Sequence, residues 1–386
     1  MIRKSTFSPT DTAILAAFCM FLSLIEYMIP KPLPFLRLGL AHLPVIISLM
    51  IFTPRQTLLL ILLKLLGQGL VNGSLFSYIF LFSSAGSLTS TLVMLAVYRL
   101  LSSKISLVGV SIAGATASNL VQIMLARLFI FGEAALLIAP VFLTIGIISS
   151  ILLGLFATSF VNQSEWINSR TTGNTAAPAS APEAAAEQAG DLRSGSLSRF
   201  TFICGLISVP AFVLQQNTVI IASEALFFII LSVIQGKRFR LLPNLIMAAG
   251  IISANLLTAH GRVLLEAGRF SITAGALETG AAKAAAIIGL IYISRLSVQK
   301  ELRLPGRLGS LLSLVFFYFE RLTGGERINR KNVMAQLDQR LMELSAVDDK
   351  KNPEPDSNRT GLVYIIALIP PIIAWLSFAA VIILKL

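Results

Sequence analysis

Long apolar runs separated by short polar stretches dominate the chain. They lie near residues 11–29, 41–53, 56–72, 74–97, 106–130 and 134–160, then near 201–215, 217–235, 241–259 and 271–295, with a last one at 361–384. A helix needs about 20 mostly apolar residues to cross a bilayer. The pattern therefore predicts an all-α polytopic membrane protein with eleven spans, of which the short second one is tilted or partly re-entrant.

Two polar segments divide these runs. Residues 161–198 contain TTGNTAAPASAPEAAAEQAGDLRSGS, which is rich in Ala, Pro, Ser, Thr and Gly. Such a segment buries too little apolar surface to fold, so it is predicted to be a disordered cytoplasmic linker. The second segment, 299–360, is polar and ends in another linker-like run. The predicted domains are a membrane domain at 1–160, the linker, and a second membrane domain at 199–386.

The composition agrees with a membrane protein. Charged residues make up 13% of the chain and hydrophobic residues 55%, with a mean hydropathy of +0.81, whereas soluble proteins carry about 25% charged residues. The net charge of +12 comes from cations in the loops, which fits loop topology and anionic lipid better than nucleic acid. Two cysteines and two histidines are too few for a metal cluster, and no cofactor is expected.

The loop cations also predict an orientation. Lys and Arg are enriched in cytoplasmic loops, so Arg3 and Lys4 place the N-terminus inside a bacterial cytoplasmic membrane. Counting spans then puts GKRFR (236–240) and the basic 299–360 region inside as well. Lys31 and Arg37 fall outside on this count. They are either exceptions to a statistical rule or cations that bind a solute.

KLLGQGLVNG, residues 64–73, places polar groups inside an apolar helix. Lys64, Gln68 and Asn72 are spaced i, i+4, i+8 and share one helix face, and the glycines between them allow close packing. An ionisable group at membrane depth costs about 3 kcal/mol unless it faces protein or water. The stripe predicts a cavity wall. The alternative is that Lys64 extends to a lipid head group while the amides hold helices together.

A second stripe favours the cavity. In SIAGATASNLVQIMLARL, Asn119 and Gln122 are three residues apart and follow turns of small residues. Together with Arg37, the two stripes predict one cationic, amide-rich pocket that opens outward. Such a pocket suits an anionic or amide-bearing solute, such as a phosphate, a carboxylate or a flavin-like ring. Glu26 is either a counter-charge or a residue of the outer interface.

Three motifs carry a family resemblance in the first domain. PFLRLGLAHLPVI (34–46), LLKLLGQGLVNGSLFS (62–77) and VGVSIAGATASNLVQIMLA (108–126) resemble the Gx transporter family, also labelled heptaprenyl diphosphate synthase component I. That family is similar in layout to the six-helix substrate-binding S components of energy-coupling-factor vitamin importers. In S components an AxxxA pattern on the first helix docks on the membrane T component. The resemblance therefore implies that Ala13 and Ala17 are docking residues.

The second domain resembles a T component over about 200–386. The likeness rests on GRFSITAGALETGAAKAAAIIGLIYISRLSVQK (268–300) and LGSLLSLVFFYFERL (308–322). It implies cytoplasmic helices within 299–360 that grip ATPase subunits, with Glu320, Arg321, Arg327 and Arg330 as coupling residues. The family's short coupling motif is not obvious, and ERINRKNV (326–333) is the nearest candidate. A basic loop lying on anionic lipid is the alternative.

Missing motifs limit the chemistry. The chain has no GxxxxGK[ST], so any ATPase must come in trans. Prenyl synthesis needs aspartate-rich motifs for Mg²⁺ and diphosphate, and DDKKNPEPD (348–356) lacks the third aspartate and lies in a linker-like run. The sequence thus predicts a non-enzyme. The favoured function is a fused S-plus-T membrane subunit of an importer. The alternative is a non-catalytic accessory or scaffold protein for flavin delivery or isoprenoid and quinone metabolism.

Overall fold

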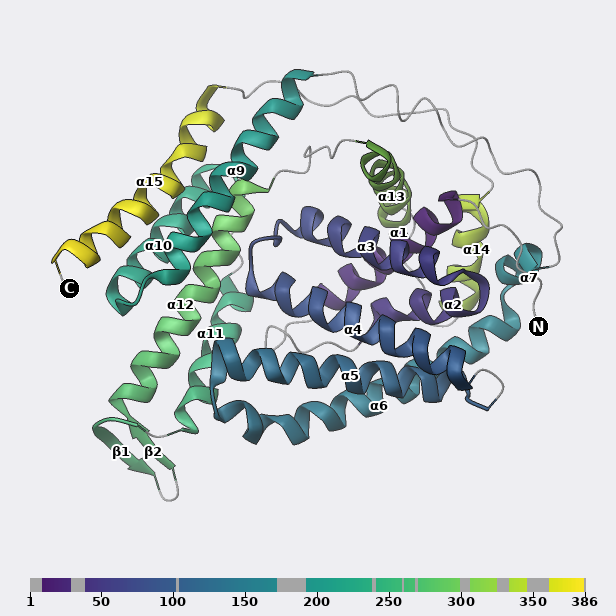
Figure 1. Cartoon of the computed structure of the whole chain (residues 1–386), viewed down its shortest axis with the longest axis horizontal. Coiled ribbons are helices and arrows are strands. Elements are labelled where there is room, and N and C mark those ends of the chain that lie inside the picture. The colour runs from purple at the N-terminus through teal and green to yellow at the C-terminus, as the bar shows by residue number, and fades with distance from the viewer. Residues whose placement is uncertain are drawn as a thin grey trace.

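The computed structural model describes the chain in ten stretches. They are residues 9–28, 39–101, 104–171, 192–237, 241–258, 260–267, 270–298, 306–324, 333–345 and 361–384. Almost all described residues are helical, and the protein is an all-α polytopic membrane protein with one small β-hairpin. Figure 1 shows two helical bundles, one at each side of the molecule.

The first bundle contains the helices predicted for the first domain. In chain order they are α1 (Pro9–Met28), η1 (Leu40–His42), α2 (Leu43–Ile51), α3 (Pro54–Asn72), α4 (Tyr78–Leu101), α5 (Leu107–Ala126), the π-helical turn η2 (Arg127–Phe131) and α6 (Ala134–Gln163). Local chemistry fixes their ends. Thr53 and Gln56 form a capping box at the start of α3, which satisfies two N–H groups that the helix leaves open. Ser106 caps α5 by accepting from the Gly109 N–H.

The second bundle is built from four helices that run side by side and a fifth that packs along α12 (Figure 1). They are α9 (Leu192–Leu214), α10 (Thr218–Ile234), α11 (Leu241–Leu256), α12 (Ala274–Ser297) and α15 (Gly361–Leu384). Asn217 caps α10 through its side-chain oxygen. Phe212, Phe228 and Tyr292 form part of the core of this bundle.

A β-hairpin precedes α12, which the sequence analysis did not predict. Strands β1 (Val263–Ala267) and β2 (Phe270–Thr273) pair antiparallel. The expected span at 271–295 therefore begins as a strand, and its helix starts at Ala274. Only residues 271–273 of the expected span lie in the hairpin, and the β-branched Ile272 and Thr273 suit a strand as well as the start of a membrane helix.

The linker prediction is wrong at both ends. α6 continues to Gln163, and residues Glu165–Thr171 form helix α7. The side chain of Trp166 in α7 is fully buried. α9 begins at Leu192, inside the segment predicted to be disordered. Compositional bias did not reveal these ends because single buried residues such as Trp166 anchor a short helix. The remaining linker residues, 172–191, lie outside the described residues.

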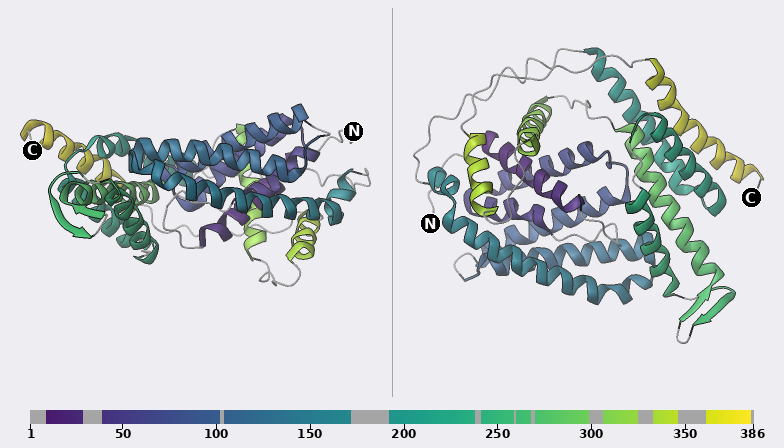
Figure 2. Two further views of the ribbon diagram at one scale, coloured as in Figure 1. Left: turned by 90° about the horizontal axis from the view of Figure 1, so that it is seen from below. Right: turned by 180° about the vertical axis from the view of Figure 1, so that it is seen from behind.

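Two amphipathic helices of the 299–360 region pack against the first bundle. α13 (Gly306–Gly324) lies along α1 and also contacts α3, and α14 (Val333–Ser345) contacts α1, α7 and α13. Leu312, Val315 and Tyr318 of α13 belong to the same core cluster as the residues of α1. Figure 2 shows both helices on the side of the first bundle away from α5. The C-terminal region therefore reaches back across the molecule.

The two bundles lie crosswise. In Figure 1 the helices α3–α6 run across the page, while α9, α10, α12 and α15 run steeply to them. An apolar contact joins them, in which Phe131 and Phe142 of the first bundle share a cluster with Met247, Ile251 and Ile287. The Phe76 N–H also donates to Ser294 Oγ at 3.0 Å.

This arrangement bears on the predicted topology. Counting spans places the turn at 73–77 outside and the end of α12 inside, yet the two segments are in contact. Both positions cannot hold in this arrangement, because a contact of 3.0 Å cannot join opposite faces of a hydrocarbon core about 30 Å thick. Five described helices are long and apolar enough to cross a membrane: α1, α4, α5 with η2, α6 and α12. The helices α2, α9, α10, α11 and α15 are apolar but give shorter stretches. The count of eleven spans stays a prediction.

Candidate functional site

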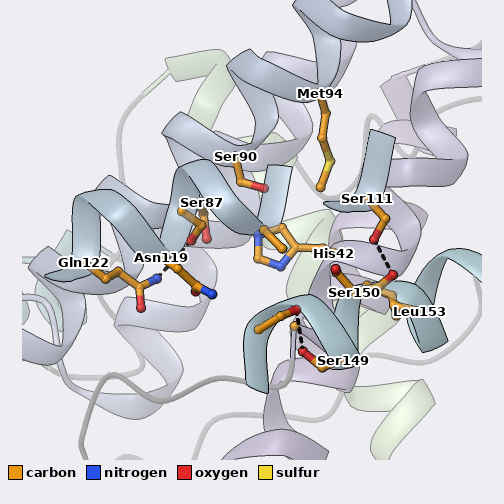
Figure 3. A pocket seen from close by; sticks show the side chains of 14 residues that line it. His42, Ser87, Ser90, Met94, Ser111, Asn119, Gln122, Ser149, Ser150 and Leu153 are labelled. Carbon is orange, nitrogen blue, oxygen red and sulfur yellow. Dashed lines mark hydrogen bonds between the residues drawn. The ribbon is translucent and has the colours of Figure 1, made fainter. Parts of the chain in front are cut away.

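A polar cavity of about 40 Å³ lies inside the first bundle. It lies between α4, α5 and α6, with His42 at its centre (Figure 3). Its walls are rich in hydroxyl and amide groups and contain one thioether. The polar lining residues are His42, Ser87, Ser90, Ser111, Ser118, Asn119, Gln122, Ser149 and Ser150, and Met94 lies beside them.

Helix α5 supplies both amides that the sequence singled out. Asn119 and Gln122 are buried, and both line the cavity. Two glycines make the space for them. A β-carbon at Gly146 of α6 would lie 1.8 Å from Asn119 Nδ2, and one at Gly86 of α4 would lie 2.3 Å from Gln122 Nε2. The small residues of this region therefore seat amides as well as bringing helices together.

Several hydrogen-bonding groups of the cavity are not used within the protein. Gln122 Nε2 donates to Ser118 Oγ at 3.0 Å, while Gln122 Oε1 and Ser90 Oγ are buried without a hydrogen-bond partner. Ser111 Oγ, in contrast, donates to the Ser150 carbonyl at 2.9 Å and ties α5 to α6. A buried polar group without a partner costs about 1–3 kcal/mol. Water or a polar ligand in the cavity would recover that cost.

Lys64 lies next to this cavity. Its side chain is fully buried, and its ammonium donates to Ser87 Oγ at 3.4 Å, a hydroxyl that lines the cavity. An amine that is 0% exposed does not extend to a lipid head group, which removes one of the two interpretations of the stripe. The Lys64 ammonium therefore lies behind the cavity wall, in contact with the lining residue Ser87.

The prediction of a single pocket is wrong. Gln68 and Asn72 line a second cavity, with Ser83 and Arg295, and neither belongs to the first. The reason is helical rise. Residues eight apart on one face are separated by about 12 Å along the axis, so Lys64 and Asn72 do not reach the same small cavity. The shared face was predicted correctly, but the convergence was not.

Sequence reasoning missed the serines and His42. The run SSAGSLTST in α4 carries Ser83, Ser87 and Ser90 at spacings of four and three, the helical period that the amides also follow. That signal was available. Serine alone is common between membrane helices, so the run indicates a binding site only once the structure shows the amides of α5 and the serines of α6 lining the same cavity.

The predicted docking and coupling residues lie in two places. Ala13 and Ala17 are fully buried in α1, the helix along which α13 packs. Glu320 and Arg321 are exposed on α13, and the Arg321 guanidinium stacks on the Phe317 ring at 4.6 Å. Arg37, Arg327, Arg330 and the 348–356 segment lie outside the described residues. Within the described stretches, no group of three or more His, Cys, Asp or Glu could hold a metal.

The cavity and its neighbouring lysine lie within one recognisable sequence region. Residues 15–160 match the family model described as heptaprenyl diphosphate synthase component I. This component I region covers all the residues that line the cavity, and the match confirms the resemblance expected for the first domain. Residues 192–300, which form most of the second bundle, match a domain family of unknown function. No curated protein and no solved structure matches the chain.

Proposed function

We propose that this protein is the membrane subunit of an energy-coupling-factor-type importer. The component I region binds a small solute, and the second bundle with α13 and α14 transmits the motion of ATPase subunits supplied in trans. The protein resides in the bacterial cytoplasmic membrane with its N-terminus inside. The observation that carries the proposal is the cavity between α4, α5 and α6, which is lined by amides, serines and a histidine and has unused hydrogen-bonding groups.

The cavity chemistry supports a solute rich in hydrogen-bonding groups. Ligand sites combine a few placed polar groups with an enclosed shape, and here two amides, a histidine and several serines converge. The Lys64 ammonium behind Ser87 favours a negative charge or a strong acceptor. A carboxylate-bearing or flavin-like vitamin has this chemistry. The present volume of about 40 Å³ holds only a few waters, so the solute enters through a more open state.

The position of α13 and α14 supports the coupling role. Both helices come from the C-terminal region, yet both pack on α1, and α14 also packs on α7, the short helix that follows α6. The contact with α7 is specific. Asp338 of α14 accepts from the N–H groups of Glu165 and Trp166 at 2.8 and 3.3 Å, and also from the Ser164 hydroxyl. A force applied to these helices would reach the component I region directly.

The solute-binding half is tested by native mass spectrometry of the full-length protein. A small molecule that co-purifies with the wild type should be lost from a variant carrying Asn119→Ala and Gln122→Ala. The matched control is Asn244→Ala in the second bundle, whose amide donates to the Tyr292 hydroxyl at 2.8 Å and does not line the cavity. Equal retention by both variants contradicts binding in this cavity.

The coupling half is tested by co-purification. Reversing the two exposed charges of α13, with Glu320→Arg and Arg321→Glu, should reduce recovery of an ATPase pair while the cavity still binds solute. Arg55→Glu, an exposed charge at the start of α3, serves as the control. Ala17→Leu should weaken the same transmission by forcing α1 away from its neighbours, because the site is fully buried. Unchanged ATPase recovery in the α13 variant removes the proposed contact.

A second candidate follows from the description of the matched family, which names a component of heptaprenyl diphosphate synthase. On this alternative the chain is a non-catalytic accessory or scaffold for isoprenoid or quinone metabolism, or for flavin delivery. The chain would then co-purify with a prenyl synthase or flavin transferase instead of an ATPase pair. The same pull-down separates the two candidates.

A further inference from the structure

The short turn between α3 and α4 of the first bundle packs against the second bundle. Gly73 ends α3 in the left-handed region, at φ 59°, and the residues that follow contact α9 and α12 of the second bundle. A β-carbon at Gly73 would lie 3.4 Å from the backbone of Arg295, so glycine serves both the backbone conformation and the close approach. Phe76 then packs on Phe202 of α9 with ring centroids 4.9 Å apart. We refer to residues 73–77 with their α9 and α12 contacts as the joint.

The second cavity lies beside this joint and measures about 20 Å³. The first bundle contributes Gln68, Asn72, Ser74 and Ser83, and the second contributes Arg295. The site is therefore complete only while the two bundles are in contact. It differs from the cavity at Asn119 in its residues and in having a cation among its lining groups.

The polar groups of this cavity are incompletely used. Ser83 is 4% exposed, and its hydroxyl has no hydrogen-bond partner, as is also true of Gln68 Oε1. The Arg295 guanidinium stacks over the Tyr292 ring at 5.2 Å, and among the described residues it forms no ion pair with a carboxylate. The Lys237 ammonium lies nearby and donates to the Arg295 carbonyl. A cationic fork, a hydroxyl and amides thus surround a small space without a negative charge from the described chain.

We propose that the joint cavity binds one oxyanion group, a carboxylate or a phosphate, through Arg295 and Ser83. An arginine fork pairs with two oxygens of such a group in a geometry that a lysine does not reproduce. The space admits about one or two oxygen-sized atoms, so the anionic end enters and the rest of the molecule lies toward the opening. Because residues of both bundles contact the same ligand, binding stabilises their mutual arrangement. This inference does not depend on solute transport through the first cavity.

Thermal unfolding of the full-length protein tests the proposal. In nanodiscs of zwitterionic lipid at constant ionic strength, inorganic phosphate should raise the melting temperature in a saturable way. Arg295→Gln should weaken the apparent phosphate affinity at least tenfold, and Ser83→Ala should weaken it less. Arg307→Gln, which removes an exposed cation of α13, should leave the affinity unchanged.

Nanodiscs containing an anionic phospholipid separate the two sources of the oxyanion. If a lipid head group fills the site, phosphate no longer shifts the melting temperature there, and native mass spectrometry finds bound anionic lipid on the wild type but not on Arg295→Gln. If free phosphate or a carboxylate solute is the ligand, the shift persists. Arg295→Lys controls for folding, because it keeps the charge and should give an intermediate affinity. Equal responses of wild type and Arg295→Gln in both lipid mixtures overturn the proposal.

Discussion

The two bundles bury polar groups in different ways. In the first bundle, Asn119, Gln122, Ser87 and Ser90 line a cavity, and two of their atoms, Gln122 Oε1 and Ser90 Oγ, have no protein partner. In the second, several polar side chains meet in pairs between helices, although Gln215 Nε2, Glu224 Oε2 and Ser232 Oγ are also buried without a hydrogen-bond partner. The Glu224 carboxylate of α10 accepts from the Ser377 hydroxyl of α15, Asn244 donates to Tyr292, and the Lys283 ammonium donates to Asn255 Oδ1 at 3.2 Å.

This difference separates binding from support. Polar groups around a hollow leave free energy to be gained from a ligand, whereas paired groups have already gained it from each other. Intramembrane polar residues are often interpreted as a binding site by default. Here the position of the unpaired groups matters: Gln122 Oε1 and Ser90 Oγ belong to residues that line a cavity, whereas the polar pairs of the second bundle hold helices together.

The largest expected effect comes from removing the buried cation of the first bundle. Lys64→Met keeps the length of the side chain but takes away the ammonium that donates to Ser87. Because hydrogen bonds to charged groups contribute about 1.5–3 kcal/mol, the co-purifying solute should fall at least tenfold while the helices stay intact. Native mass spectrometry with circular dichroism measures both. Lys104→Met, an exposed cation, is the control, and equal solute occupancy in the two variants would sink the role of Lys64.

A second change adds a methyl group to the cavity wall instead of removing a charge beside it. Gly146→Ala places a methyl group where Asn119 Nδ2 now lies, 1.8 Å from the new atom, so the amide must turn away. Solute affinity should drop about tenfold, with a stability cost of about 1 kcal/mol at the low end of overpacking. Gly324→Ala, where nothing lies within 4 Å of the added carbon, should change neither quantity. An unaltered affinity for Gly146→Ala argues that Asn119 does not face the ligand.

A third change concerns the contact between the C-terminal helices and the first bundle. Asp338→Asn replaces the carboxylate that caps α7 and should cost about 1 kcal/mol, as lost helix caps do. Hydrogen exchange of residues 164–171 should accelerate while that of α5 stays the same. Glu343→Gln on the same helix, an exposed residue bonded only to Gln339 among described residues, provides the comparison. If α7 exchanges equally in both variants, the cap does not hold it.

The smallest effect is expected in the second bundle. Ser377→Ala removes the hydroxyl that donates to Glu224 and should lower stability by about 1 kcal/mol, the average contribution of a hydrogen bond. Solute occupancy should not change, since the pair lies outside the cavity. Ser223→Ala, an exposed hydroxyl bonded to its own helix, should be neutral. A loss of solute in Ser377→Ala would break the distinction between the bundles.

Hydropathy predicted most of the helices because a bilayer imposes one requirement on every spanning segment, a length of apolar helix. It failed where residues suit two structures equally well, as in strand β2 at the start of the expected span 271–295, and where one buried residue outweighs composition, as Trp166 does in α7. Helical periodicity correctly placed Lys64, Gln68 and Asn72 on one face of α3 and correctly paired Asn119 with Gln122. It carried no information on depth along the axis, which divides the two cavities.

The sequence by itself determined that this is a membrane protein of two helical regions, and its motifs showed the first region to be similar to the heptaprenyl diphosphate synthase component I family, because composition and short-range spacing are written in consecutive residues. Only the tertiary structure decided which polar residues share a cavity. That outcome depends on Gly86 and Gly146 standing opposite the amides of α5, on the turn at Gly73 reaching Arg295, and on α13 returning to α1. Each is a contact between segments far apart in the chain, and the spacing of neighbouring residues does not determine such contacts.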